Sequence, residues 1–169
     1  MMLPDTEKRW IAVYTKSRHE KTAYDQLVQK NIEAYLPLIR TKRRWSDRTK
    51  WVDVPLFRSY LFVRIELKNH LYVLQTIGVH HVIKFNQEVA IISDEQIQSI
   101  KLMIEGGYNP ESVDYFVVGD KAEIAAGPMK GIRGIVSRID GEDKFVIKID
   151  AIQHAISVHV ERNFLKAIK

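Results

Sequence analysis

The last third of the chain constrains the fold most strongly, because it contains five short β-type runs and no helical periodicity. Glycine, proline and aspartate separate these runs, as at Gly127-Pro128 and Asp140-Gly141. The runs occupy residues 121–125, 134–139, 144–150, 155–160 and 165–168. A sheet this small hides its edges most simply by closing on itself. We therefore expect a small closed β-barrel over residues 117–169.

The preceding residues alternate strand and helix patterns. A β-branched and aromatic run, Trp10 to Tyr14, leads into helical spacing of apolar residues, with Ser17 and Glu20 at the spacing of a capping box. Further strands are expected at 32–39, 60–65 and 79–85, and further helices near 71–75 and from Ser93 to Gly106. This order predicts the α+β class, as a split βαβ sandwich with helices on a mainly antiparallel sheet.

The net charge of +5 is concentrated in the first third of the chain. Residues 1–60 carry 13 Lys and Arg against 7 Asp and Glu, whereas the rest carries 13 against 14. The excess is densest between residues 40 and 50, where Ser46 and Asp47 supply turn chemistry. We expect a protruding basic hairpin whose field attracts polyanions. A merely solvated hairpin is the alternative, and the flanking Trp45 and Trp51 favour nucleic acid.

Several function classes lose their usual signals. The chain has no cysteine, and it lacks the local motifs of acyl transfer, nucleotide hydrolysis and zinc proteolysis. The adjacent His80 and His81 are expected to point to opposite faces of a strand and not to share a metal. We therefore expect no enzyme and no cofactor. The apolar runs are too short to span a bilayer and residues 1–10 do not resemble a secretory signal, so a cytoplasmic protein without membrane contact is expected.

The glycine pattern of the second part resembles the KOW motif, which occurs in NusG-family transcription factors and in some ribosomal proteins. Gly119-Asp120 is followed by Gly127-Pro128, then by Gly134 and Val136, in the order of that motif. Any small barrel needs glycine corners, but here the whole order is present. The resemblance implies an SH3-like KOW barrel, in which Gly134 permits a close backbone approach.

The first part resembles the amino-terminal domain of the NusG family. Trp10 to Tyr14 followed by Lys16 matches its opening, and residues 55–63 match its hallmark strand. Arg58-Ser59 stands where the family usually has Pro-Gly, which favours a specialised paralogue of the RfaH or UpxY kind. The resemblance implies a NusG amino-terminal domain at 1–107, a linker at 108–116 and a KOW domain at 117–169.

The resemblance also implies a non-catalytic transcription elongation or antitermination factor. It implies that RNA polymerase is bound by Tyr60, Phe62, Asn69, His70 and Tyr72, and upstream or non-template DNA by Lys16, Arg18, Lys42, Arg43, Arg44 and Arg48. The KOW domain would contact a further protein, such as a ribosomal small-subunit protein or Rho, through Met129 and Lys130. Strand alternation places Leu61 and Val63 in the core and Tyr60 and Phe62 on the opposite face.

A KOW-containing RNA-binding or ribosome-associated protein is the alternative, because such barrels also occur there and the basic surface suits RNA. Co-purification separates the two classes. Polymerase subunits would support the transcription factor, and ribosomal RNA without polymerase would support the alternative.

Overall fold

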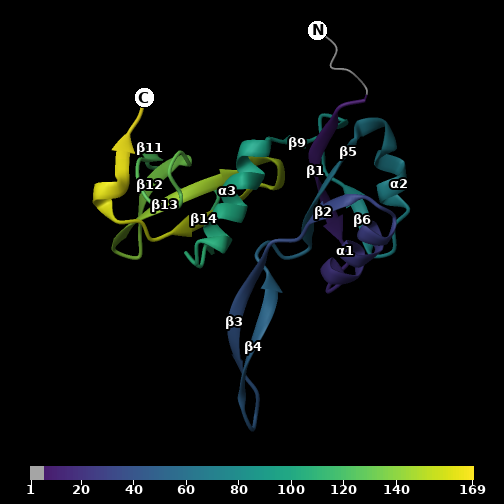
Figure 1. Cartoon of the computed structure of the whole chain (residues 1–169), viewed down its shortest axis with the longest axis horizontal. Helices are drawn as coiled ribbons and strands as arrows, with labels where there is room; N and C mark the ends of the chain where they lie inside the picture. Colours follow the sequence, from purple (N-terminus) through teal and green to yellow (C-terminus); the bar gives the residue numbers. More distant parts are fainter. Residues whose placement is uncertain (1–5) are drawn as a thin grey trace. The chain divides into compact units, whose positions relative to one another are not determined.

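The computed structural model describes residues 6–169, and the chain divides into two compact units, Met1–Asp94 and Glu95–Lys169 (Figure 1). The division falls at the start of helix α3 (Asp94–Glu105), whereas the sequence pattern placed it after that helix. Each unit contains its own antiparallel sheet. The mixed α and β content and the antiparallel pairing confirm the predicted class in outline.

The first unit is built on one sheet with a helical layer. Its strands follow the order β2 (Glu33–Tyr35), β5 (Tyr60–Glu66), β1 (Lys8–Thr15) and β6 (Val79–Val82), and β9 (Ile91–Ile92) also pairs with β1. Its helices are α1 (Glu20–Gln29) and α2 (His70–Leu74), the latter preceded by a 3-10 turn, Leu67–Asn69. A two-stranded ribbon joins β7 (Lys84–Phe85) and β8 (Glu88–Val89). The strand and helix patterns of the sequence therefore predicted the main elements correctly.

The core of the first unit lies between the sheet and its two helices. Successive strand residues face opposite sides, so Ile11 and Val13 of β1 share a face with Leu61 and Val63 of β5. These four side chains belong to one buried cluster with Leu27 of α1. The prediction that Leu61 and Val63 enter the core is confirmed.

The start of α1 differs from the predicted capping box. Arg18 has a left-handed backbone with φ of 61°, so the chain turns there and the helix begins at Glu20 without a side-chain cap. Glu20 is buried, and its carboxylate accepts the Ser59 amide hydrogen at 3.2 Å. Ser59 itself has φ of 67°, a conformation that favours glycine. Glu20 therefore stabilises the strained turn that enters β5.

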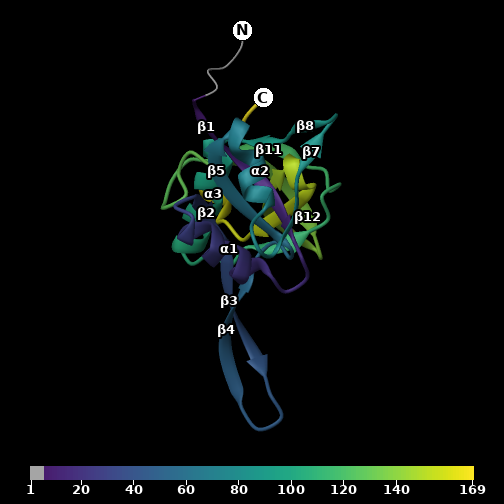
Figure 2. The ribbon, with the colours of Figure 1, turned by 90° about the vertical axis from the view of Figure 1, so that its right-hand side faces the viewer.

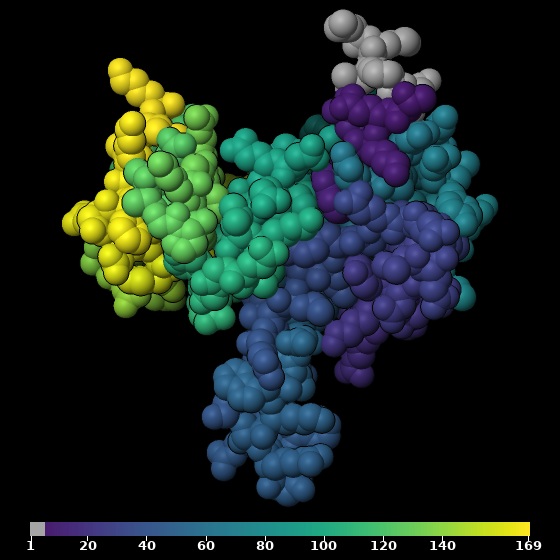
Figure 3. Space-filling view, in the orientation of Figure 1, coloured from purple at the N-terminus to yellow at the C-terminus, as the bar shows by residue number. Residues whose placement is uncertain are grey.

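The predicted basic hairpin is present as β3 (Leu38–Arg44) paired with β4 (Thr49–Pro55). Its base is fixed to the first unit: Leu36 is in the core cluster, and the Leu56 amide donates to the Pro37 carbonyl at 2.9 Å. Lys21 of α1 donates to the Asp53 carbonyl at 2.8 Å. Figures 1 and 2 show the rest of the hairpin extending away from the sheet, and the space-filling view in Figure 3 shows it projecting beyond the rest of the first unit.

The second unit contains a six-stranded antiparallel sheet. Its order is β10 (Glu111–Val113), β14 (His154–Val158), β13 (Glu142–Ile149), β12 (Arg133–Ile139), β11 (Asp120–Ile124) and β15 (Leu165–Ala167). Five of these strands match the five predicted runs. The sixth, β10, lies in the predicted linker, where a run of three residues is too short to show a pattern and pairing with β14 decides the structure.

Gly134 is needed where β12 packs closely against its neighbour β13. A Cβ atom there would lie 2.4 Å from the Val146 carbonyl oxygen and 2.8 Å from the Phe145 ring, which confirms the predicted close approach.

Within residues 6–169, no strand pairing joins β15 to β10, the two edge strands of this sheet. None of the helices in this part of the chain is long and apolar enough to cross a membrane.

Replacing Ser59 by glycine is expected to stabilise the first unit by about 0.5–1 kcal/mol. The change relieves roughly 1–2 kcal/mol of left-handed strain and costs about 0.5–1 kcal/mol of added chain entropy in the unfolded state. Denaturant unfolding followed by tryptophan fluorescence measures it, because Trp10, Trp45 and Trp51 all lie in the first unit. Ser46→Gly, at the hairpin tip without a positive φ, is the control and should give no gain. A loss of stability in Ser59→Gly would contradict the strain argument.

Candidate functional site

One face of the β3–β4 hairpin combines an aromatic ring with cations. The register pairs Lys42 with Trp51, Arg40 with Asp53 and Arg44 with Thr49. Because alternate residues share a face, Arg40, Lys42 and Arg44 lie on the same side as Trp51. The Arg40 guanidinium carbon is 6.0 Å and the Lys42 Nζ 5.8 Å from the Trp51 ring centre. Trp51 remains 55% exposed.

The charges of the hairpin are not neutralised by the protein. Arg43 faces Lys50 directly across the two strands, an arrangement that destabilises a sheet. Within residues 6–169, no ion pair joins a carboxylate to Arg40, Lys42, Arg43, Arg44, Arg48 or Lys50. At the tip, the Trp45 amide donates to the Arg48 carbonyl at 2.7 Å and closes the turn. The hairpin therefore presents unpaired positive charge to an external anion.

A second group of rings gathers where β1, β5 and β6 meet. The Tyr14 ring lies edge-on to Tyr60, with ring centres 5.2 Å apart, and stacks on His81 at 5.0 Å. It also meets the His80 ring edge-on at 5.9 Å. Tyr60 is partly exposed and both histidines are exposed. These four residues form what we call the ring cluster.

The prediction that His80 and His81 point to opposite faces is wrong. Their Nδ1 atoms are 2.8 Å apart. The β1–β6 register explains this: Tyr14 pairs with His81, but Thr15 pairs with Val79, so His80 is the extra residue of a bulge. A bulge bends the strand and interrupts its alternation. Within residues 6–169, no three potential ligands gather to hold a metal.

The histidine pair accommodates one proton between its Nδ1 atoms, because one ring must donate and the other accept. Partial loss of water around the ring, and next the charge of His80, lower the pKa of His81. Burial, and next the Tyr14 phenol, raise the pKa of Tyr60. Both shifts favour the neutral forms of His81 and Tyr60.

The prediction of an outward-facing Phe62 is wrong. Phe62 is fully buried, with its ring edge-on to Phe57 at 5.9 Å and stacked on Tyr35 at 6.4 Å. Alternation does separate Phe62 from Leu61, but side chains cover that face as well, and Ala12, its partner on β1, is also fully buried. Phe62 therefore supports the sheet from within and presents no surface for a partner.

An exposed apolar area lies on α2 and the turn after it. Its exposed fractions are 57% for Leu71, 49% for Tyr72, 39% for Leu74 and 65% for Ile77, and we call these residues the α2 surface. Lys30 of α1 lies over the Tyr72 ring at 4.5 Å and fixes its position. Of the other predicted residues on this segment, Asn69 is exposed and His70 partly buried. Sequence analysis named Tyr72 but missed Leu71, Leu74 and Ile77, whose only signal was their apolar character on a short helix.

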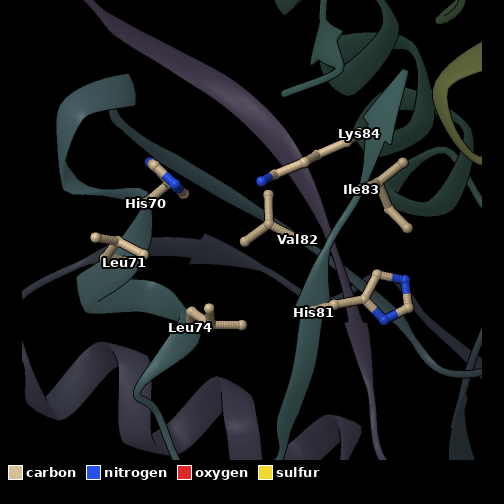
Figure 4. Close-up of a pocket in the computed structure, with 7 residues that line it drawn as sticks. All are labelled: His70, Leu71, Leu74, His81, Val82, Ile83 and Lys84. Atoms are coloured by element: carbon tan, nitrogen blue, oxygen red, sulfur yellow. The ribbon is translucent and has the colours of Figure 1, made fainter. Parts of the chain in front are cut away.

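A groove of about 420 Å³ borders the α2 surface (Figure 4). Its lining residues are His70, Leu71 and Leu74 from α2 and His81, Val82, Ile83 and Lys84 from β6 and the residues that follow it. Figure 4 shows the Val82 and Lys84 side chains directed from the strand toward the helix. His81 also lines the groove, but Figure 4 shows its ring directed away from the helix, so the ring cluster lies on the other side of β6 from the α2 surface.

The predicted cations Lys16 and Arg18 lie near the ring cluster. Both are exposed in the turn between β1 and α1, and the Lys16 amide donates to the Gly78 carbonyl at 2.9 Å, just before β6. They are on a different element from the hairpin cations. Within residues 6–169, no hydrogen bond or ion pair links the two groups.

In the second unit the prediction of an exposed Met129 is wrong. Met129 is only 1% exposed, although the neighbouring Lys130 is exposed. Two backbone hydrogen bonds close this loop. The Gly131 amide donates to the Ile124 carbonyl at 2.8 Å, and the Ile132 amide donates to the Met129 carbonyl at 3.2 Å. This tight turn directs the methionine inward. Lys130 alone remains available on this loop from the predicted pair.

Comparison with known proteins matches the first unit and the first residues of the second unit to a described family. Residues 8–101 match the family model NusG, described as transcription termination factor nusG. A solved structure titled "Domain interaction in Thermotoga maritima NusG" is similar over 96% of this chain and 98% of its own, with 20% identity and a TM-score of 0.56. That likeness shows a shared fold. A structure of the MjSpt4:Spt5 complex matches over 95% of this chain and 98% of its own chain, with 19% identity. Its TM-score of 0.31 is below the value expected for a shared overall fold.

His81 is expected to titrate below the ordinary imidazole value of about 6.5. Because its folded pKa is lowered, its contribution to folding is present above about pH 6.5 and is lost as pH falls through the folded pKa. Imidazole resonances in an NMR titration measure this. His80→Ala should raise the pKa of His81, because it removes a neighbouring charge and opens the ring to water, whereas His159→Ala should leave it unchanged. A His81 midpoint at or above 6.5 in the natural sequence would refute the argument.

Proposed function

The chain belongs to the NusG family of transcription factors, and on that premise we propose that it is an elongation or antitermination factor that binds RNA polymerase. In this proposal it performs no chemistry of its own. The first unit binds the polymerase, the hairpin contacts upstream or non-template DNA, and the second unit contacts a further protein. The observation that carries the proposal is the exposed apolar α2 surface within the region that matches the family.

The α2 surface and the ring cluster are the two proposed contacts with the polymerase. Exposed apolar side chains that gather in one area mark protein interaction sites more often than scattered ones do. Tyr60 and Tyr72 are rigid rings that lose little entropy on burial, which is typical of interface hot spots. Asn69 and His70 border this surface and complete the proposed contact. Phe62 is not part of it, because it is buried.

The basic hairpin is the proposed DNA contact. Its unpaired cations attract phosphates through release of counterions, and Lys42, Arg43, Arg44 and Arg48 are the proposed phosphate ligands. Lys16 and Arg18 add positive charge at the end of the sheet. Phosphate contacts position a protein on DNA without reading bases, so the hairpin contributes affinity and not a recognised sequence.

The second unit is proposed to be a KOW domain with a closed SH3-like barrel. The glycine pattern and the close approach at Gly134 support this proposal. Lys130 is its proposed contact for a ribosomal small-subunit protein or Rho. Ser59, which adopts a glycine-type backbone without being glycine, supports a specialised paralogue of the RfaH or UpxY kind.

The double variant Leu71→Ala, Tyr72→Ala is expected to weaken binding to purified RNA polymerase at least about tenfold, because two exposed apolar contacts are lost. Tyr60→Ala should weaken it in the same direction. Titration of fluorescently labelled full chain with polymerase measures the dissociation constants. Phe116→Ala is the matched control, because Phe116 is 77% exposed but lies in the second unit.

Equal affinity of all four proteins would contradict the polymerase surface proposed here. Recovery of ribosomal RNA without polymerase from cells would favour the RNA-binding alternative instead. Circular dichroism of each variant checks that the fold is retained, which is expected because the replaced side chains are exposed or partly exposed.

A further inference from the structure

We infer that the Trp51 face of the β3–β4 hairpin is a binding site for single-stranded nucleic acid. In this site an unpaired base stacks on the Trp51 indole, and Arg40, Lys42 and Arg44 hold the neighbouring phosphates. The inference rests on the proposed nucleic-acid contact of the hairpin and specifies its ligand and its binding mode. It also adds Arg40 and Trp51 to the contact residues.

The strand register brings these four side chains to one face. Lys42 is directly opposite Trp51, and Arg40 and Arg44 occupy the next same-face positions along β3 on either side of Lys42. The ring is thus flanked by cations in both directions along the strand. This spacing suits a chain of nucleotides, in which charged phosphates alternate with flat bases.

The Trp51 ring is open to a ligand. Its two cation contacts, at 6.0 and 5.8 Å, are at the outer limit of a cation–π interaction and leave the residue 55% exposed. Exposure of a large apolar ring to water is unfavourable. A hairpin that served only to keep the protein soluble would not benefit from an exposed tryptophan. Stacking of a base covers the ring and favours binding without sequence preference, because every base has a flat π face.

The combination of open ring and cations favours single strands over duplex. Cations attract the phosphates of single strands and of duplexes through the same electrostatic interaction. In a duplex, however, each base is already stacked on its neighbours and must be extruded before a protein ring can stack on it. The indole therefore adds affinity only where bases are unpaired. Single-stranded DNA and RNA share this chemistry.

The opposite face of the hairpin provides an internal comparison. At the tip, the exposed Trp45 lies beyond the last paired residues of the two strands. The paired part of the opposite face holds Thr41, Arg43, Lys50 and Val52, so it carries two cations but no ring. It is expected to contribute salt-dependent attraction and no preference for bases. Val52 is adjacent to Trp51 on β4 and partly buried, which makes Val52→Ala a matched truncation on that face.

The test measures binding of the full chain to fluorescently labelled twelve-nucleotide probes at several salt concentrations. The probes are oligo-dT, oligo-rU, an abasic strand with the same number of phosphates, and a DNA duplex. We expect Trp51→Ala to weaken binding to oligo-dT or oligo-rU about fivefold or more without changing the salt slope. Trp51→Phe should retain most of the affinity, and Val52→Ala should bind oligo-dT and oligo-rU as tightly as the natural sequence does. On the abasic strand, Trp51→Ala and the natural sequence should bind equally.

The outcomes separate this inference from the proposed function. If the natural sequence binds the abasic strand as tightly as oligo-dT and oligo-rU, or if Trp51→Ala binds all probes normally, stacking is refuted while a phosphate contact stands. Tighter binding to duplex than to single strands also refutes it. A Trp51-dependent preference for oligo-dT supports the site and identifies DNA as its ligand, and the same preference for oligo-rU identifies RNA. Failure of polymerase binding by itself would refute the proposed function and leave the stacking site standing.

Discussion

The antiparallel ladder between β1 and β5 positions two candidate sites of the first unit, the ring cluster and the hairpin. Ile11 opposite Val63 and Val13 opposite Leu61 pack against the helical layer and fix which side chains face the core. The same ladder ends at the pair Tyr14 and Tyr60, where the ring cluster begins. The chain leaves the sheet after β2 as the hairpin and returns through Leu56 and the strained Ser59 turn into β5. The hydrophobic packing of β1 and β5 at the centre of the sheet therefore determines the positions of the ring cluster and of the hairpin.

The elements that the sequence predicted correctly are those that carry a local signal. Alternation in residues 60–65 and the charged turn at Ser46 and Asp47 depend on neighbouring residues, so the strand and the hairpin followed from pattern alone. The errors arise where distant residues decide. Phe62 is buried because Phe57 and Tyr35 cover it, and the histidine rings meet because of a bulge that only the β1–β6 register shows. Met129 was expected outside because the resemblance implies a partner contact at this position, whereas the hydrogen bonds of its turn direct it inward.

The hairpin illustrates a conflict between stability and function. Arg43 opposite Lys50 and an exposed Trp51 each disfavour an isolated two-stranded ribbon, which is marginal in water in any case. The base of the ribbon compensates, because Leu36 is buried in the core and Lys21 binds the Asp53 carbonyl. Features that break a local folding rule and are supported elsewhere are typical of functional sites. The hairpin thus carries an unfavourable charge pattern that an external polyanion would relieve.

Two contact surfaces on one folded unit have a consequence for binding strength. The α2 surface and the hairpin belong to the same unit, and the root of the hairpin is held by core packing and hydrogen bonds. Once one surface is engaged, the other is presented to its partner at a high effective concentration, provided that both partners belong to one complex. Neither contact then needs to be strong by itself. In the proposed function, the protein contact at α2 decides where the molecule binds, so a weak, sequence-independent nucleic-acid contact on the hairpin is sufficient to slow its dissociation.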